Sequence, residues 1–219
     1  MIKLRIDVDY PYPSRLKSFI YTALNSKKQR KGYLKNSKII AKMINESPKE
    51  IRAYWFFTPF TVPNQELLGM LNPDRHEVAL HVATKPYEEL KHLEKVTKRK
   101  VNYYTVHGTA RLLARVIWRR KLNQAVVPIP TGFPLQSFYV YPTLGLDVLA
   151  HTCSVEEATM QAEESIAKGE VLHVHPEWLF QRGTFNHRGP YYEVLKEILQ
   201  VDKDLEALVI KKKSFFQNS

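Results

Sequence analysis

The stretch Ile2-Lys3-Leu4-Arg5-Ile6-Asp7-Val8-Asp9 decides the fold class of this chain. Apolar and charged residues alternate along it with the period of two that a β-strand imposes, so Asp7 and Asp9 share one face of the strand. Pro11 and Pro13 then break the pattern. We therefore expect an N-terminal strand that carries two carboxylates at its carboxyl end.

From this strand outward, stretches with strand and helix patterns alternate to the end of the chain. Strands are expected at 53–57, 77–81, 101–106, 170–174 and 207–210. Helices are expected at 37–45, 86–97, 109–121, 154–168 and 191–199, whereas a Pro-rich connection around 128–134 interrupts the rhythm. The pattern predicts a single α/β domain over residues 1–219, with a largely parallel sheet or barrel and a basic tail from about residue 211.

Composition narrows the class of protein further. Of the 219 residues, 44% are hydrophobic and 25% are charged, which is typical of a globular protein and excludes a disordered one. A single cysteine, Cys153, excludes an intrachain disulfide framework and a thiolate-rich zinc site. No uncharged apolar stretch reaches the roughly 18 residues of a membrane span, so the expected location is cytoplasmic.

The chain is strongly basic, with 33 Lys and Arg residues against 22 Asp and Glu residues and a net charge of +11. Such an excess favours contact with phosphates, acidic glycans or an anionic membrane surface. Arg111, Arg115 and Arg119 recur every four residues and form a basic stripe on the expected helix. This stripe is either a solvated surface or a contact for a phosphate-bearing or lipid-linked substrate.

Three of the expected strands end in side chains that suit a common chemical task. They are Asp7 and Asp9, then His81, then His173 and His175. Two residues along a strand rise by about 6.6 Å, so the two carboxylates can serve one pocket in different roles, one as metal ligand and one as base. The alternatives are solvated turn residues for the carboxylates, a hydrogen-bonded core position for His81 and a packing role for His173.

Four short motifs occur in an informative order. They are Ile6-Asp7-Val8-Asp9, Tyr54-Trp55-Phe56-Phe57, His76-Glu77-Val78-Ala79-Leu80-His81 and Leu172-His173-Val174-His175-Pro176. In this order they resemble the polysaccharide deacetylases with a NodB-type homology domain, which are carbohydrate esterases, over residues 2–200. The resemblance implies a distorted (β/α)7 barrel in which a divalent metal, usually zinc, polarises an acetyl carbonyl and activates water. It further implies the general base Asp7, the metal ligands Asp9 and His81, and the general acid His175.

One position departs from the family pattern. The resemblance places a second metal-binding histidine four residues after His81, where this chain has Lys85. A protonated lysine has no lone pair for zinc, so a third ligand has to come from elsewhere, and His107 at the end of the fourth expected strand is the candidate. Lys85 is then either a substrate contact or the surface start of a helix. Arg111, in place of the family's arginine, is a second candidate for substrate binding.

Taken together, these features predict a metal-dependent hydrolase that removes an acetyl group from an N-acetylated sugar or a glycan precursor. The expected partner is a carbohydrate, phosphate-bearing or lipid-linked, with peripheral contact to an anionic membrane surface and without nucleic acid. Two alternatives stay open. One is a degenerate homologue that binds glycans without hydrolysis, because Lys85 replaces a ligand. The other is a basic nucleic-acid-binding protein, which net charge and the arginine stripe alone support.

Overall fold

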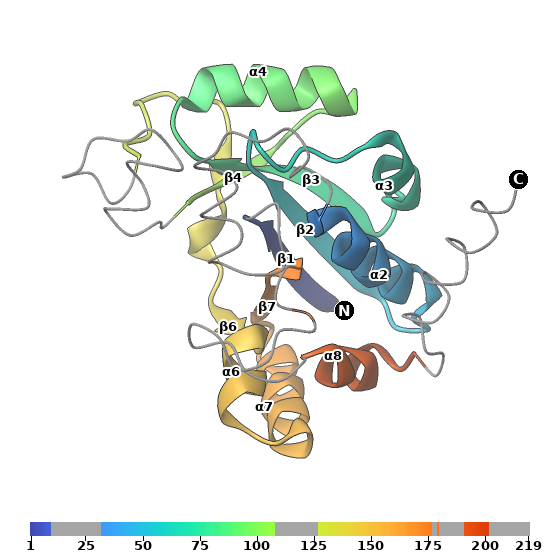
Figure 1. The fold of residues 1–219 in the computed structure, drawn as a ribbon. Coiled ribbons are helices and arrows are strands. Elements are labelled where there is room, and N and C mark those ends of the chain that lie inside the picture. Colours follow the sequence, from blue (N-terminus) through green and yellow to red (C-terminus); the bar gives the residue numbers. More distant parts are fainter. Residues whose placement is uncertain (10–31, 108–126, 177–178, 180–190, 202–219) are drawn as a thin grey trace, which may run out of the picture.

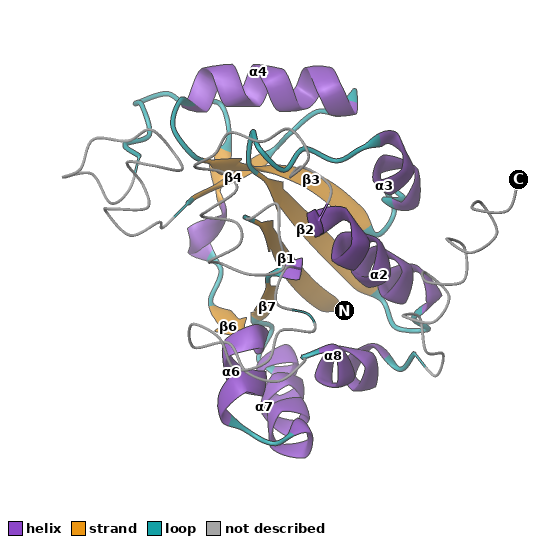
Figure 2. Cartoon of the chain, viewed as in Figure 1, coloured by secondary structure: helices purple, strands orange, loops and turns teal. Residues whose placement is uncertain are grey.

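The structure is a computed structural model that describes residues 1–9, 32–107, 127–176, 179 and 191–201 (Figure 1). The helix expected at 109–121 and the strand expected at 207–210 lie outside the described residues. The same holds for the basic tail, the arginine stripe and its first member, Arg111. The described part consists of helices around a curled sheet (Figure 2).

The described elements alternate between strands and helices for most of the chain. The strands are β1 (Ile2–Val8), β2 (Ile51–Phe57), β3 (His76–Val82), β4 (Tyr103–Val106), β5 (Gln136–Ser137), β6 (Thr143–Gly145) and β7 (Val171–Val174). The helices are α2 (Gly32–Glu46), α3 (Gln65–Met70), α4 (Pro86–Thr97), α6 (Leu146–Thr152), α7 (Val155–Ala167), α8 (Tyr192–Leu199) and the 3-10 helix η2 (Phe138–Val140).

All neighbouring strands run parallel, in the order β5-β4-β3-β2-β1-β7-β6. The sheet curls into a half-barrel, which confirms the expected α/β class with a parallel sheet (Figure 1). The edge strands β5 and β6 follow each other in the chain, so η2 leads from one edge of the sheet to the other. These two short strands do not pair with each other in the described part, and the complete (β/α)7 barrel is therefore not confirmed.

The two faces of the sheet have different surroundings. Every second residue of β1 from Ile2 to Val8 is buried in the large core between the sheet and the helices. The inner face holds a smaller aromatic cluster, in which Phe138 of η2 packs against Phe56 of β2. Asp7 and Asp9 alternate with the outward residues of β1. The strand therefore directs both carboxylates into the half-barrel, next to the inner faces of β3 and β7.

The structure contains the helix caps that the sequence indicates. At the start of α7, Ser154 Oγ accepts from the Glu157 backbone and the Glu157 carboxylate accepts from the Ser154 backbone, each over 3.2 Å. Helix α4 begins at Pro86, as its sequence predicts. Gly169 ends the turn after α7 at a φ of 78°, a left-handed conformation that favours glycine. These caps fix the start of β7, the strand that carries two of the predicted site histidines.

After the Pro-rich stretch 128–134, which is irregular as expected, the structure differs from the sequence-based expectation. From residue 136 to residue 152 the chain forms β5, η2, β6 and α6, which the sequence does not predict. The two strands are too short to display a period of two, and η2 is a single turn, so no sequence pattern marks them. The difference matters for the site, because α6 carries the buried carboxylate of Asp147.

His76 belongs to one of the four motifs but lies on the outer face of the sheet. Trp55 Nε1 donates to His76 Nδ1 over 2.9 Å, and His76 Nε2 lies 2.9 Å from Asn45 Oδ1. Burial, with smaller contributions from nearby arginines, lowers the pKa of His76 to about 3, so the imidazole is neutral at neutral pH. His76 thus ties β3 to β2 and α2 and has a structural role.

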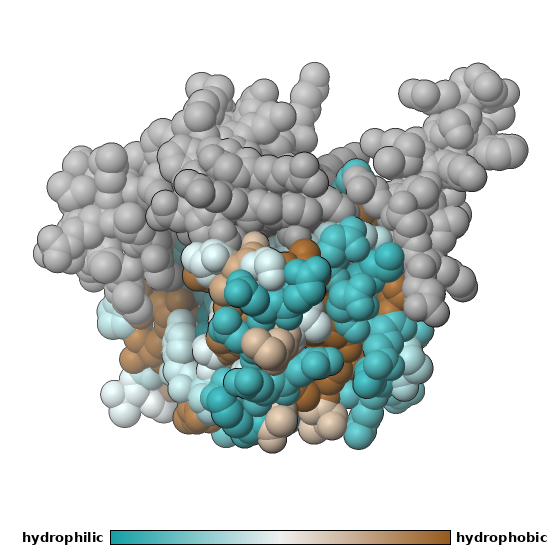
Figure 3. Space-filling model, turned by 90° about the horizontal axis from the view of Figure 1, so that it is seen from below, coloured by the Kyte–Doolittle hydropathy of each residue, from teal (hydrophilic) through white to brown (hydrophobic). Residues whose placement is uncertain are grey.

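None of the helices in the described part combines the length and the apolar character needed to cross a bilayer. Seen from below, the side on which α7 and α8 lie carries mostly hydrophilic side chains with separate hydrophobic ones between them (Figure 3). The apolar faces of these helices are instead turned toward the sheet, where Ala158, Ala162, Leu195 and Ile198 are buried.

Candidate metal centre

Acidic and histidine side chains from four strands meet at one end of the half-barrel. The carboxyl ends of parallel strands lie at the same edge of a sheet, so residues far apart in the sequence come together there. Two groups result, and within each the donor atoms lie within 4.8 Å of one another. We call them the first triad, Asp9, His81 and His107, and the second triad, Asp7, His173 and His175.

The first triad joins the ends of β1, β3 and β4. Its residues are all buried, with exposed fractions of 7% for Asp9, 2% for His81 and 3% for His107. His81 Nε2 lies 2.9 Å from Asp9 Oδ1, and His107 Nε2 lies 3.8 Å from Asp9 Oδ2. The two imidazole rings stack with their centroids 5.1 Å apart. The structure therefore brings together the two ligands implied by the resemblance and the third one proposed from strand position.

The donor atoms of the first triad fit a divalent cation. Asp9 Oδ1 is buried and has no hydrogen-bond partner among the described residues, because its 2.9 Å contact with His81 Nε2 is not aligned as a hydrogen bond. Atoms that face a common ion give this pattern, since tetrahedral ligands at about 2.0–2.1 Å from zinc lie about 3.3 Å from one another. The first triad can therefore hold a metal ion, and its nitrogen and oxygen donors suit zinc.

The charge of Asp9 also suits a cation. Burial by itself would raise the pKa of this carboxyl group, but the neighbouring His107 and His81 hold the pKa well below its usual range. Asp9 is therefore ionised at neutral pH. A buried carboxylate without a compensating positive charge is costly, and no arginine of the described residues forms an ion pair with Asp9 as Arg5 does with Asp7.

Thr105, on the strand next to His81, orients the His81 ring. Thr105 Oγ1 lies 2.6 Å from His81 Nδ1, across the ring from the Nε2 atom that faces Asp9. A histidine that binds a metal through Nε2 carries its proton on Nδ1 and donates it to an acceptor of this kind. Thr105 thus favours the tautomer of His81 that a metal site requires.

We expect the Thr105→Val variant to bind zinc about 10- to 100-fold more weakly than the wild type, because valine keeps the shape of threonine but accepts no hydrogen bond from His81. Competition with a chromophoric chelator measures this affinity. Thr143→Val, at an exposed position of β6, is the matched control and should bind zinc like the wild type. An unchanged affinity in Thr105→Val would show that His81 does not bind zinc through Nε2.

The second triad is built around an ion pair on β1. Arg5 Nε and Nη2 donate to Asp7 Oδ1 and Oδ2 over 2.9 and 2.5 Å, and both side chains are buried. His173 Nε2 lies 3.1 Å from Asp7 Oδ2, and this buried nitrogen has no aligned hydrogen-bond partner in the described part of the chain. Burial would raise the pKa of Asp7, but Arg5 and the nearby histidines hold it well below its usual range. Asp7 is therefore ionised at neutral pH.

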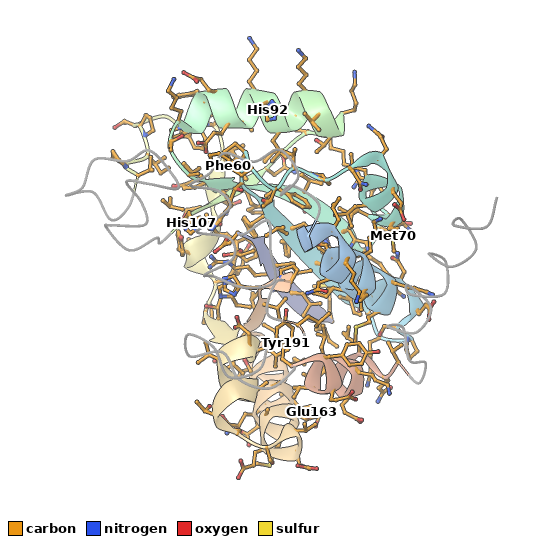
Figure 4. All side chains as sticks on the ribbon, viewed as in Figure 1. Phe60, Met70, His92, His107, Glu163 and Tyr191 are labelled. Carbon is orange, nitrogen blue, oxygen red and sulfur yellow. The ribbon has the colours of Figure 1, made fainter. Side chains whose placement is uncertain are left out.

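His175 forms a hydrogen-bonded pair with Asp147 of α6. Its Nδ1 donates to Asp147 Oδ2 over 2.8 Å, while its Nε2 lies 3.6 Å from Asp9 Oδ2 and faces the first triad. Tyr191, just before α8, donates to the backbone carbonyl of His175 and fixes the chain there (Figure 4). An imidazole held by a buried carboxylate presents its other nitrogen for proton transfer.

The remaining predicted site residues have other positions. Lys85 stands at the start of α4, where its Nζ donates to the Glu88 carboxylate over 2.8 and 2.9 Å and its side chain is 66% exposed. The structure thus places this ammonium group at the surface, as expected for the start of a helix. Arg111 lies outside the described residues.

Among the described residues, sequence reasoning missed Arg5, Thr105 and Asp147, whose side chains contact the triads. Arg5 follows the same period of two as Asp7, so its inward direction was readable from the sequence, although its bidentate pairing was not. No sequence signal marks Asp147, because the elements around it are too short to show a pattern.

Comparisons with known proteins do not assign a role to this site. No family model matches the chain, and neither a curated protein nor a solved structure is significantly similar to it. The resemblance of the four motifs to polysaccharide deacetylases therefore stays a prediction, and the function has to be inferred from the side chains themselves.

Proposed function

We propose that the protein is a metal-dependent hydrolase that removes an acetyl group from an N-acetylated sugar or a glycan precursor. One observation carries the proposal: the candidate ligands, the candidate base Asp7 and the candidate acid His175 meet at one end of the half-barrel. His107 takes the place in the ligand set that Lys85 leaves open, so metal binding does not depend on that lysine. The choice of a carbohydrate amide as substrate rests on the resemblance of the four motifs.

The buried charges support a divalent cation at the first triad. Among the described residues of the site, Asp7, Asp9 and Asp147 bring three carboxylates and Arg5 brings one guanidinium. Two net negative charges therefore remain when the histidines are neutral, and one remains when His175 is an imidazolium. Buried charge of this kind is stable only when it is compensated. Because Arg5 already pairs with Asp7, the negative charge that needs a partner lies on the side of Asp9.

A divalent cation held by Asp9, His81 and His107 would polarise the acetyl carbonyl and lower the pKa of a nearby water molecule. Asp7 Oδ2 lies 3.9 Å from His81 Nε2, close enough to this position to take the proton of the water as its oxygen attacks the acetyl carbon. His175, stabilised as an imidazolium by Asp147, gives its Nε2 proton to the amine nitrogen as the C–N bond breaks. The products are acetate and the free amino sugar.

The charge of the whole chain supports an anionic form of the carbohydrate. A net charge of +11 attracts phosphate groups and anionic surfaces over a range of about 8 Å at physiological ionic strength. A phosphate-bearing or lipid-linked sugar, met at the surface of an anionic membrane, combines these features with the acetyl amide that the site would cleave.

Acetate release from a panel of N-acetylated sugars, with one equivalent of zinc present, tests the proposal. We expect Asp7→Asn to lower turnover by about 100- to 10,000-fold and to keep its zinc, because asparagine accepts no proton and residue 7 is not in the first triad. Asp74→Asn, in an exposed turn between β2 and β3, is the matched control and should retain full turnover.

Three results would redirect the proposal. Full turnover in Asp7→Asn would contradict the role of Asp7 as base. Sugar binding without acetate release in the wild type would favour the non-catalytic glycan-binding alternative. Binding to nucleic acid that falls steeply with salt, without any binding of sugars, would favour the third alternative.

A further inference from the structure

His173 has no part in the proposed reaction, yet it is built into the site. Its ring packs against that of His175 with the centroids 4.5 Å apart, and its Nε2 lies 3.1 Å from Asp7 Oδ2. This nitrogen is buried, and among the described residues no hydrogen-bond partner is aligned with it. A nitrogen lone pair at this distance from an ionised oxygen is repelled unless a proton or a cation lies between the two atoms.

We infer that Asp7, His173 and His175 form a second site for a divalent cation, beside the first triad. Their donor atoms lie within 4.8 Å of one another, and the 3.1 Å between His173 Nε2 and Asp7 Oδ2 is close to the separation of about 3.3 Å expected for ligands of one zinc ion. Arg5 occupies one lone pair of each Asp7 oxygen. A carboxylate oxygen has two lone pairs, so Asp7 Oδ2 can bind a cation as well.

The two cation sites lie next to each other, so an ion in the first site affects the binding of an ion in the second. His81 Nε2 of the first triad lies 3.9 Å from Asp7 Oδ2, and His175 Nε2 lies 3.6 Å from Asp9 Oδ2. Two ions would therefore be close neighbours, as in two-metal hydrolases. The first ion balances the net negative charge that the described residues of the site carry, so the second ion gains no such attraction and is repelled by the first. The second ion is the weaker one.

Occupancy of the second site has a consequence for catalysis that rests on the proposed function. Asp7 and His175 move the protons of the proposed reaction, and a cation bound to both takes up the lone pairs that this requires. Zinc beyond one equivalent is therefore an inhibitor of acetate release. Removal of the excess with a weak chelator restores turnover.

Titration of the metal-stripped full chain with zinc alone, followed by equilibrium dialysis and elemental mass spectrometry, tests the second site. The wild type should bind two ions, the second at least about tenfold more weakly than the first. His173→Gln should bind one ion with the affinity of the first site. His81→Ala should lose the ion at the first triad and bind one ion at the second site, more tightly than the second ion of the wild type, because no first ion repels it. His92→Gln, at an exposed position of α4, is the matched control and should bind two ions (Figure 4).

A single zinc ion per wild-type chain at saturation would overturn the inference, and so would two ions in His173→Gln. The stoichiometry is read without substrate, so it fails independently of the proposed function. Two ions at saturation, together with no acetate release at one equivalent of zinc, would refute the hydrolase and keep the second site. Acetate release with one ion at saturation would keep the hydrolase and refute the second site.

Discussion

The His81→Ala variant is expected to bind zinc at the first triad at least about 100-fold more weakly than the wild type. His81 contributes the nitrogen that lies closest to Asp9, and Thr105 holds its ring in place. Its loss leaves two side chains for an ion that ordinarily keeps three protein ligands in a catalytic site. Competitive titration with a chelator of known affinity gives the dissociation constant for zinc. The rate of acetate release should fall at least as much as the fraction of protein that holds zinc.

Replacing the buried His81 with alanine also removes packing contacts and lowers stability. The zinc affinities of the variant and the wild type therefore have to be compared under conditions in which both are folded. Unfolding by denaturant without zinc measures the loss of stability, and zinc affinity is then read under conditions in which the variant is folded. His92→Ala, on the exposed side of α4, is the matched control and should bind zinc like the wild type (Figure 4). Equal zinc affinity in His81→Ala and the wild type would contradict the assignment of His81 as a ligand.

The Arg5→Met variant is expected to lose about 3–5 kcal/mol of the free energy of unfolding at pH 7, because it leaves the buried carboxylate of Asp7 without its cation. Methionine retains much of the apolar stem of arginine but loses the guanidinium group, whose Cζ lies 5.6 Å from the ring centroid of Phe56 and 5.3 Å from that of Tyr139. The loss of stability therefore comes mainly from electrostatics and not from packing. Equilibrium unfolding in urea measures it.

The pH dependence of this loss has a definite sign. In the wild type the pKa of Asp7 is well below its usual range, so its contribution to stability is complete above about pH 4, the unfolded pKa, and disappears as the pH falls further. Without Arg5, burial moves the pKa of Asp7 upward and the variant takes up a proton on folding. The difference between variant and wild type should therefore be larger at pH 7.5 than at pH 5.

Two further variants separate the charge effect from a loss of packing. Arg5→Met combined with Asp7→Asn removes the uncompensated charge and should recover most of the lost stability. Arg52→Met breaks the more exposed pair of Arg52 with Glu77, at 2.8 Å, and should cost about 1 kcal/mol or less. A loss in Arg5→Met that is independent of pH and not recovered by Asp7→Asn would show that packing dominates.

The long, regular elements of the fold could be predicted from the sequence because they carry a period. The alternation in β1 marks both the strand and its inward face, and the Ser154 capping box marks the start of α7. The elements between 127 and 153 carry no such period, because the strands β5 and β6 have only two and three residues. Their pairing is decided by the sheet edges that they meet, which no local sequence pattern encodes.

The candidate site could be predicted in part for the same reason. Parallel strands bring their carboxyl ends together, so Asp9, His81 and His107 could be grouped from strand position alone. The residues that set the charge of the site could not be predicted from the sequence. Asp147 reaches His175 from a helix that the sequence does not mark, and the orphaned Nε2 of His173 is visible only when the distance to Asp7 is known.

Anomalous diffraction at the zinc edge, from crystals grown with one equivalent of zinc, would locate the ion in the protein. We predict one strong peak at about 2.0–2.2 Å from a carboxylate oxygen of Asp9 and from the Nε2 atoms of His81 and His107. With zinc in excess, a second and weaker peak should appear between Asp7 and His173. The absence of any peak near Asp9 at one equivalent would contradict a metal centre at the first triad.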